Sequence, residues 1–250
     1  MPSFKNGDVE IAYLDEGDGE PILLVHGFAS NKEVNWVNPG WVSTLKGDGR
    51  RVIAFDHRGH GQSTKLYDVA AYGVDKMALD AVALLDHLRI ERGDVLGYSM
   101  GGRVTGQLAS AHGDRVRSAT IGGIGIRLCE AGFNSDKIAD ALEAPNADGI
   151  TDAQALGFRM FALQTKSDLK ALAACMRNNN RTISREAAAS IGVPVLIATG
   201  TEDTIAGSGD ELGALIPGSK VLNIPGRDHM FAVGDRVFKQ GVLEFLKQRP

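Results

Sequence analysis

The chain has 250 residues, of which 43% are hydrophobic, and its formal net charge is −4. This length suits one α/β domain with a modest insertion, because a chain of this size buries roughly 70 to 75% of its unfolded surface. Acidic and basic residues are interspersed, and there is no basic run with aromatic interleaving. These features argue against nucleic acid or an anionic membrane as a partner and favour a small neutral ligand.

Targeting signals and cysteine spacing bear on the compartment. The first ten residues lack the apolar stretch of a signal peptide, and nowhere do about 18 apolar residues follow one another. We therefore expect a cytoplasmic protein that does not span a membrane. Cys129 and Cys175 are the only cysteines and lack the Cys-x-x-Cys spacing of metal or redox sites. We expect two buried, reduced thiols without a function, and no bound metal.

Short runs rich in β-branched residues, each bounded by Gly, Pro or Asp, predict buried parallel strands. In chain order, after an alternating segment 9–14 that predicts an antiparallel edge strand, these runs are 22–25, 52–55, 95–98, 116–121, 193–198 and 221–224. Helical patterns lie between them, and the clearest is 74–88, with Asp75, Asp80 and Asp86 outside its apolar face. This alternation predicts a doubly wound, mostly parallel sheet, whose ligands bind beyond the carboxyl ends of the strands.

The alternation stops after the strand at 116–121. From 127 to 189 the sequence is mostly helical, with candidate helices at 138–142, 153–163 and 168–176. Because this segment falls between two parallel strands, it should emerge at the carboxyl edge of the sheet, and we interpret it as a lid. The alternative is a set of ordinary helices that cover the sheet. The predicted organisation is a core of residues 1–126 and 190–250, with a helical lid of residues 127–189 inserted after the sixth strand.

The segment Gly97-Tyr98-Ser99-Met100-Gly101 is typical of a serine on a sharp turn between a strand and a helix. Strand and helix pass so closely in such an elbow that side chains two residues before and after the serine would collide. Glycines at these two positions remove the collision. In a glycine-rich chain this pattern can occur by chance, so the residues around it must show whether Ser99 is a nucleophile. Ser99 is the candidate nucleophile.

A serine hydroxyl needs a general base to become a nucleophile. His229 is the candidate among six histidines, because it directly follows the last predicted strand, where a loop can reach over the sheet edge. His26 and His60 lie in glycine-flanked turns and are expected to bond nearby backbone instead.

The base must be oriented by a buried carboxylate. Asp203 is the candidate, since it follows the strand at 193–198. The adjacent Glu202 would face the other way if the strand continued, and Asp228 is too close in sequence to His229 to reach its ring edge easily.

Two backbone N–H groups are candidates for an oxyanion hole, in which each donor is worth roughly a hundred- to a thousandfold in rate. The Met100 amide follows the nucleophile and opens a helix, where N–H groups are unpaired and the dipole favours negative charge. The Phe28 amide lies in the loop His26-Gly27-Phe28 after the strand at 22–25. A plain glycine turn into the next helix explains His26 and Gly27 equally well.

The sequence resembles the α/β-hydrolase superfamily over nearly its whole length, through His26-Gly27-Phe28, the segment 56–63, Gly97 to Gly102, Asp203 and His229. The chain order serine, aspartate, histidine is that of these hydrolases. The glycine motifs look like those of small carboxylesterases, cofactor-free haloperoxidases and perhydrolases, enol-lactone hydrolases and carbon–carbon bond hydrolases. The resemblance implies the α/β-hydrolase fold and no metal or organic cofactor. One departure is the segment after Asp203, which lacks the proline that many relatives have there.

The implied reaction is two-step acyl transfer on a small carboxylic ester. Ser99 attacks the carbonyl, His229 takes and returns the proton, Asp203 stabilises the imidazolium, and water releases the acid. The mostly apolar lid without charged clusters suggests short acyl chains on neutral esters. The candidate substrate-binding residues are Phe28, Met160, Phe161, Met230 and Phe231, with Met100 and Leu163 as further walls.

Two other interpretations stay open. Arg103 lies four residues after Ser99, as an arginine does in menaquinone-pathway lyases of this superfamily, which bind carboxylate-rich substrates. We favour a solvated helix residue, unless Arg127, Arg159 and Arg177 converge with it. An enol-lactone or carbon–carbon bond hydrolase would also fit such a substrate. The other interpretation is a hydrolase-fold receptor that binds a ligand and turns it over slowly.

Overall fold

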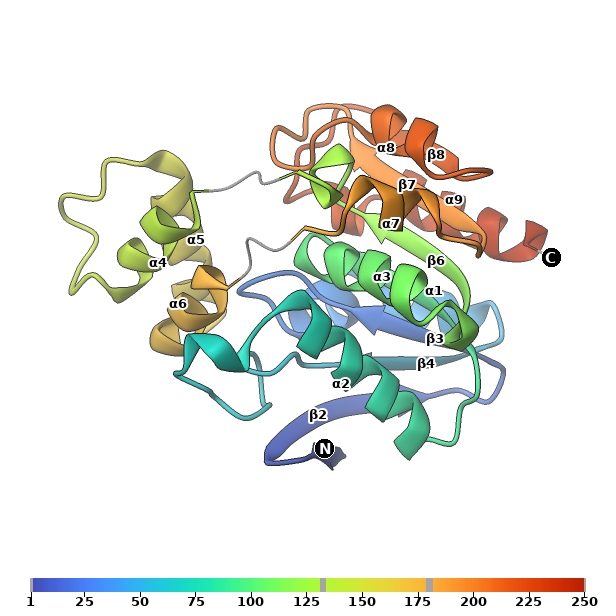
Figure 1. Ribbon diagram of the computed structural model, residues 1–250, viewed down its shortest axis with the longest axis horizontal. Helices are drawn as coiled ribbons and strands as arrows, with labels where there is room; N and C mark the ends of the chain where they lie inside the picture. Colours follow the sequence, from blue (N-terminus) through green and yellow to red (C-terminus); the bar gives the residue numbers. More distant parts are fainter. Residues whose placement is uncertain (1, 131–133, 179–181, 250) are drawn as a thin grey trace.

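The computed structural model describes residues 2–130, 134–178 and 182–249. Within these ranges one sheet of eight strands has the order β1-β2-β4-β3-β5-β6-β7-β8 (Figure 1). The strands are β1 Ser3–Asn6, β2 Val9–Glu16, β3 Glu20–Val25, β4 Arg50–Phe55, β5 Gly93–Tyr98, β6 Val116–Gly122, β7 Val195–Gly200 and β8 Lys220–Ile224. The β1·β2 and β2·β4 pairs are antiparallel and the other pairs are parallel. The predicted doubly wound, mostly parallel sheet is confirmed. The segment 9–14 is antiparallel as expected but is not the edge strand, because β1, which the sequence reasoning missed, pairs with its outer side.

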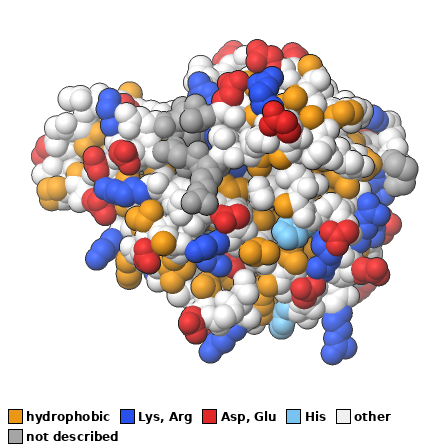
Figure 2. All heavy atoms as spheres, in the orientation of Figure 1, with side chains coloured by type: hydrophobic (Ala, Val, Ile, Leu, Met, Phe, Trp, Pro, Cys, Tyr) orange, Lys and Arg blue, Asp and Glu red, His pale blue; other side chains and the backbone are white. Residues whose placement is uncertain are grey.

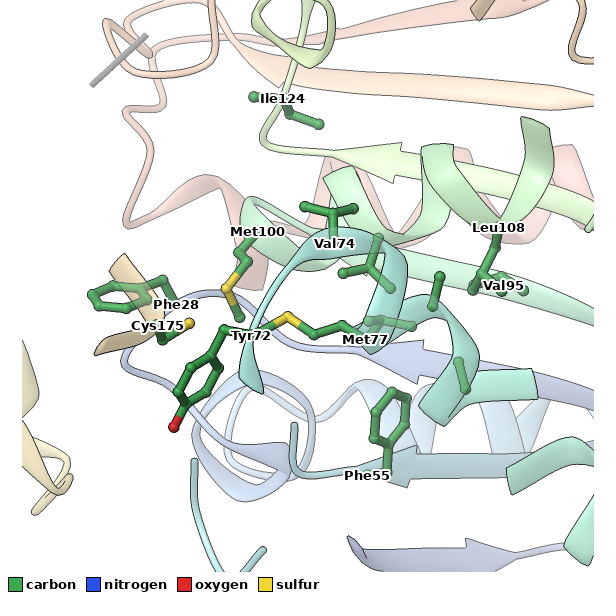
Figure 3. Packing of buried hydrophobic residues seen from close by; sticks show 14 of the residues in the cluster. Phe28, Phe55, Tyr72, Val74, Met77, Val95, Met100, Leu108, Ile124 and Cys175 are labelled. Carbon is green, nitrogen blue, oxygen red and sulfur yellow. The ribbon is translucent and has the colours of Figure 1, made fainter. Parts of the chain in front are cut away.

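Successive residues of a strand point to opposite sides, and central strands such as β5 and β7 are buried on both faces of the sheet. Strand β8 lies at the sheet edge and is largely exposed, which corrects the prediction of a buried strand at 221–224. Leu23 of β3 belongs to one hydrophobic cluster and Leu24 to the other. Figure 3 shows part of the first cluster, with Leu108 and Val95 of β5 among its labelled residues. Helices α2 (Val74–His87) and α3 (Met100–Ala111) cover this face, while α1 (Trp41–Gly47) and α9 (Arg236–Gln248) cover the opposite one.

Helices connect the strands and also extend beyond them. In chain order they are α1 Trp41–Gly47, α2 Val74–His87, α3 Met100–Ala111, α4 Ser135–Glu143, α5 Ala153–Gln164, α6 Leu169–Arg177, α7 Arg185–Ala189, α8 Gly209–Leu215 and α9 Arg236–Gln248. Short helical turns are η1 Glu33–Val37, η2 Val69–Ala71, η3 Gly113–Arg115, η4 Ile126–Leu128 and η5 Ala232–Gly234.

Helices α4, α5 and α6, here called the inserted helices, follow β6 and lie beyond one end of the sheet (Figure 1). Each begins at a side-chain cap: Asn134, Asp152 and Asp168 each accept a backbone N–H from the first turn of the helix that follows. Their apolar residues, such as Leu142 and Leu172, belong to the same cluster as α2 and α3. The inserted helices are therefore packed onto the core.

One helix face differs from its prediction. Asp80 of α2 was expected outside the apolar face but is fully buried. Arg58 Nε and Nη2 donate to its two carboxylate oxygens, each at 2.7 Å, and Asn6 Nδ2 donates at 2.8 Å. The buried charge is thus paired by residues distant in sequence, which helical periodicity does not show.

The outer surface is mixed in charge, and Figure 2 shows acidic and basic side chains interspersed on the face drawn. Across the described ranges, no helix has both the length and the hydropathy that a membrane crossing requires. Both cysteines are free thiols. Cys175 is buried as expected, whereas Cys129 is partly exposed, which corrects the expectation of two buried thiols.

Candidate active site

The candidate site lies where the strand order reverses. The chain passes from β3 to β4 on one side and then to β5 on the other side of β3. In open parallel sheets such a reversal leaves a crevice beyond the carboxyl ends of the strands. Phe28 follows β3, Ser99 follows β5, Asp203 follows β7 and His229 follows β8. The sheet therefore brings all four predicted residues to one edge.

Ser99 occupies the sharp turn between β5 and α3. Its φ of 57° and ψ of −116° lie in a region that residues with side chains rarely adopt. Its N–H donates to the Gly122 carbonyl at 2.8 Å, and its carbonyl accepts from Arg103 N–H at 3.1 Å. Strand β6 and the first turn of α3 thus hold the strained turn in place.

Gly97 and Gly101 are required by close backbone approach. A Cβ at Gly97 would lie 2.1 Å from the Gly101 carbonyl oxygen, and a Cβ at Gly101 would lie 1.9 Å from the Val25 carbonyl oxygen. Neither position can hold a side chain. At residue 101 the obstacle is the end of β3 rather than the strand that precedes the serine.

Ser99, His229 and Asp203 form one hydrogen-bonded chain. His229 Nε2 lies 2.9 Å from Ser99 Oγ, and His229 Nδ1 lies 2.8 Å from Asp203 Oδ2. Because a carboxylate only accepts hydrogen bonds, Nδ1 carries the imidazole proton and Nε2 accepts from the serine hydroxyl. This arrangement can take the proton from Ser99 as its oxygen attacks a carbonyl.

Asp203 is held in place by the backbone that follows it. Its side chain is fully buried, and Oδ1 accepts from Ile205 N–H at 2.8 Å and Ala206 N–H at 2.9 Å. Oδ2 is thereby directed to the imidazole. The two other carboxylates considered lie elsewhere: Glu202 is exposed, and Asp228 accepts from the N–H groups of the two residues after His229.

Tyr98 supports the loop that carries His229. The Tyr98 hydroxyl donates to the His229 carbonyl at 2.7 Å. Burial, together with the negative charges of Asp203 and Asp228, raises the pKa of Tyr98 well above its usual value, so the phenol stays protonated and remains a donor. The sequence reasoning missed this residue, although a tyrosine directly before the serine at the end of a buried strand is a usable signal.

The Phe28 and Met100 amides are placed to serve as an oxyanion hole. Neither N–H donates to any group in the described part of the chain. His26 Nδ1 donates to the Gly27 carbonyl at 2.7 Å. Because the C=O and N–H of a trans peptide point in opposite directions, this bond directs the Phe28 N–H to the other side. A Cβ at Gly27 would lie 3.3 Å from Ser99 Cβ, so the loop contacts the nucleophile.

The segment 56–63 supports the loop that carries Phe28. His57 N–H donates to His26 Nε2 at 3.0 Å, which fixes the His26 tautomer. Asp56 accepts from Lys32 N–H at 2.8 Å and from Lys32 Nζ at 2.7 Å, and both side chains are fully buried. Burial lowers the pKa of His26, His57 and His60, the last to about 3, so these rings stay neutral at ordinary pH.

A cavity of about 660 Å³ opens at Ser99 and His229. Of the predicted substrate-binding residues, Phe28, Phe161, Met230 and Phe231 line it. Met160 does not and is 52% exposed, which corrects its prediction. The physical reason is helical spacing: α5 faces the cavity through residues 154, 157, 158 and 161, and Met160 falls outside that face. Met100 and Leu163 likewise do not line it.

The remaining described lining residues are uncharged. They include polar side chains that the sequence reasoning missed, namely Ser30, Asn35, Gln154 and Thr204, and the apolar Phe158 and Ile205. No Asp, Glu, Lys or Arg is among the described residues that line the cavity. Groups of three or more metal-ligating side chains are likewise not found within residues 2–130, 134–178 and 182–249.

The four arginines do not converge on this cavity. Arg103 is 5% exposed, not solvated as expected, and burial beside Arg127 lowers its pKa to about 10. Arg159 donates to the last carbonyls of α4. Arg177 pairs with Asp140 and with a second carboxylate of α4 on the surface. None of the four lines the cavity.

Comparison with known proteins shows which family the chain belongs to. The α/β hydrolase fold family model matches residues 20–159, more than half of the chain. The chain is 27% identical to the non-heme chloroperoxidase CPO-A1 of Kitasatospora aureofaciens, over 96% of this chain and 97% of that protein. Among solved structures it is similar to a hydrolase from Pseudomonas aeruginosa PA01, with a TM-score of 0.81, 23% identity and coverage of 98% and 97% of the two chains. The enol-lactonase from Burkholderia xenovorans LB400 matches with a TM-score of 0.77, 24% identity and coverage of 99% and 100%. The chain belongs to the α/β hydrolase fold family.

Proposed function

We propose that the protein is a serine hydrolase that cleaves small, neutral carboxylic esters through a covalent acyl-enzyme intermediate. The observation that carries this proposal is the continuous chain from Ser99 Oγ through His229 to Asp203, with distances of 2.9 and 2.8 Å, at the cavity. Membership of the α/β hydrolase fold family supports hydrolase activity, and the choice of an ester as substrate is ours.

In the acylation step, Ser99 Oγ attacks the ester carbonyl while His229 Nε2 takes its proton. Asp203 stabilises the resulting imidazolium through Nδ1–H. The negative oxygen of the tetrahedral intermediate accepts from the Phe28 and Met100 N–H groups. His229 then gives the proton to the departing alcohol oxygen, and the acyl group remains on Ser99.

In the deacylation step, water replaces the alcohol. His229 takes a proton from the water as its oxygen attacks the acyl carbonyl, and the same two N–H groups stabilise the second tetrahedral intermediate. Collapse breaks the bond to Ser99 Oγ, which regains the proton from His229. The products are the free acid and the original enzyme.

The cavity supports the choice of a neutral substrate. Its described lining offers no charged side chain to pair with a carboxylate or phosphate, and Phe28, Phe158 and Phe161 supply apolar surface. Helix α5 forms one wall, which supports the interpretation of the inserted helices as a lid. A substrate rich in carboxylates is disfavoured, because the arginines that would bind it lie elsewhere.

Labelling combined with turnover tests the proposal. A fluorophosphonate probe should label wild-type protein at Ser99 and fail to label Ser99→Ala, and wild type should show multiple turnovers on p-nitrophenyl acetate. Labelling without turnover would favour the ligand-receptor alternative. Comparing acetate, butyrate and dodecanoate esters tests acyl size, and a preference for dodecanoate would refute a small acyl group. Lactones and thioesters in the same screen would show whether the ester is the better substrate.

A further inference from the structure

Asn35 brings a polar side chain into the otherwise largely apolar cavity. It lies on η1, a single π-helical turn in which Asn38 N–H donates to the Glu33 carbonyl at 2.8 Å. Such turns are rare and often occur at functional sites. The wide turn buries two consecutive side chains, Asn35 at 6% exposure and Trp36 at 0%. Asn35 lines the cavity, whereas Trp36 packs in the core.

The orientation of the Asn35 amide is fixed by its partner. Gly27 N–H donates at 2.9 Å to Asn35 Oδ1, so the other end of the amide must be the NH₂ group. Among the described residues no group accepts a hydrogen bond from this Nδ2, and Nδ2 is not one of the fully buried polar atoms that lack a partner, so it remains accessible. The amide also lies near the nucleophile, because a Cβ at Gly27 would lie 3.3 Å from Ser99 Cβ and 3.6 Å from Asn35 Oδ1.

Ser30 adds a second polar group to the cavity lining. It lines the cavity at 3% exposure, and its hydroxyl has no hydrogen-bond partner among the described residues. A buried polar group without a partner is costly to a folded protein. The Ser30 hydroxyl is such a group, and together with the Asn35 Nδ2 donor it indicates a place in the cavity lining where a ligand atom completes the hydrogen bonding.

We propose that Asn35, together with Ser30 of the same cavity lining, forms a subsite that binds a second, uncharged oxygen of the substrate, such as an ether or keto oxygen near the scissile ester. This inference rests on the proposed esterase function. The free Nδ2 is a donor, which calls for an acceptor atom on the ligand. The acceptor is uncharged because the described lining holds no Lys or Arg to pair with a carboxylate. A donor left unpaired by a substrate without the oxygen selects against that substrate.

Isosteric ester pairs test the subsite. p-Nitrophenyl methoxyacetate and p-nitrophenyl butyrate differ by one oxygen in place of a methylene in the acyl part, and 2-methoxyethyl butyrate and butyl butyrate differ in the same way in the alcohol part. For each pair, kcat/KM of the ether-containing ester is divided by kcat/KM of its all-carbon counterpart. This ratio is then compared between wild type and Asn35→Asp. This variant keeps an acceptor for Gly27 N–H and removes the donor. The ratio of at least one pair should fall by about 3- to 10-fold, the equivalent of one hydrogen bond.

Asn31→Asp is the matched control. Asn31 lies just before the same turn, and its Oδ1 accepts from Val34 N–H at 2.9 Å, but it does not line the cavity. The ratios should be unchanged in this variant. Asn35→Ala, which also removes the bond to Gly27, should lower kcat for all four esters and in addition shift the same ratio. If Asn35→Asp does not fold, the ratios measured with Asn35→Ala test the subsite instead.

Binding separates this inference from the proposed function. In Ser99→Ala protein, 2-methoxyethyl butyrate should raise the melting temperature more than butyl butyrate does, and adding Asn35→Asp should abolish the difference. Wild type that turns over none of the esters would contradict the esterase proposal, while this binding difference would still support the subsite. Ratios unchanged in both Asn35 variants, or equal melting shifts with both esters, would overturn the subsite.

Discussion

Asp203→Asn should stop catalysis by trapping the wrong imidazole tautomer. In the structure, Asp203 Oδ1 accepts from the Ile205 and Ala206 N–H groups at 2.8 and 2.9 Å, and Oδ2 accepts from His229 Nδ1 at 2.8 Å. An asparagine must keep its oxygen toward the two backbone donors, so its NH₂ group faces Nδ1. Nδ1 then has to accept, the ring proton moves to Nε2, and Nε2 no longer takes the proton of Ser99.

The expected loss of kcat is large because His229 can no longer act as the general base, although the site stays folded. A wrong-tautomer substitution of this kind costs roughly ten-thousandfold in kcat, or about 5 kcal/mol of transition-state stabilisation. Steady-state kinetics on p-nitrophenyl butyrate near pH 8 measure kcat, and thermal unfolding checks that the fold is kept. The rate of fluorophosphonate labelling at Ser99 should fall in parallel, since it needs the same proton transfer.

Asp228→Asn is the matched control. Asp228 Oδ1 also accepts from two successive N–H groups, those of Met230 and Phe231 at 3.0 and 2.9 Å, and it sits next to His229 in sequence. It makes no hydrogen bond to the imidazole, so its variant should keep kcat within a few-fold of wild type. If Asp203→Asn retained kcat within tenfold while folded, the reasoning about the tautomer would be refuted.

Three further outcomes are expected. Ser99→Ala and His229→Ala should each lower kcat by roughly a millionfold, about the cost of losing the whole relay, and a folded Ser99→Ala that still hydrolyses p-nitrophenyl acetate would overturn the mechanism. His26→Ala removes the shorter of the two hydrogen bonds to the Gly27 carbonyl and leaves the one from Ser30 N–H at 3.3 Å. The Phe28 amide is then less well directed, so kcat should fall by up to roughly a hundredfold, and wild-type kcat would count against the role of His26 in orienting that peptide. Burial lowers the pKa of His60 from 6.5 to about 3 in the folded protein. Between these two pH values the unfolded chain binds a proton at His60 and the folded protein does not, so the free energy of unfolding decreases as the pH falls from about 6.5 toward 3. The unfolding free energy of wild type relative to His60→Gln, measured in urea, should therefore drop by about 1.4 kcal/mol per pH unit below pH 6, whereas parallel pH profiles would contradict this.

Features encoded in short stretches of the chain were predictable from the amino-acid pattern alone. β-Branched runs between turn residues marked the strands, because a strand buried on both faces must be apolar throughout. The turn at Ser99 was recognisable because only glycine fits at residues 97 and 101. Asp203 and His229 could be selected by their positions after strands, since parallel strands deliver their carboxyl ends to one edge.

Features that depend on partners distant in the chain became apparent only in the folded molecule. Asp80 looked like a surface residue until Arg58 was found against it, and Arg103 looked solvated although neighbouring elements cover it. Met160 was predicted to line the pocket because it is apolar, but an apolar residue can lie on either side of α5, and Met160 lies on the exposed side. Asn35 carried no signal, because its meaning comes from a π-helical turn that directs it to Gly27, eight residues away in sequence. The local sequence pattern indicates whether a segment packs against an apolar or a polar environment. Which residues it then contacts is determined by tertiary packing.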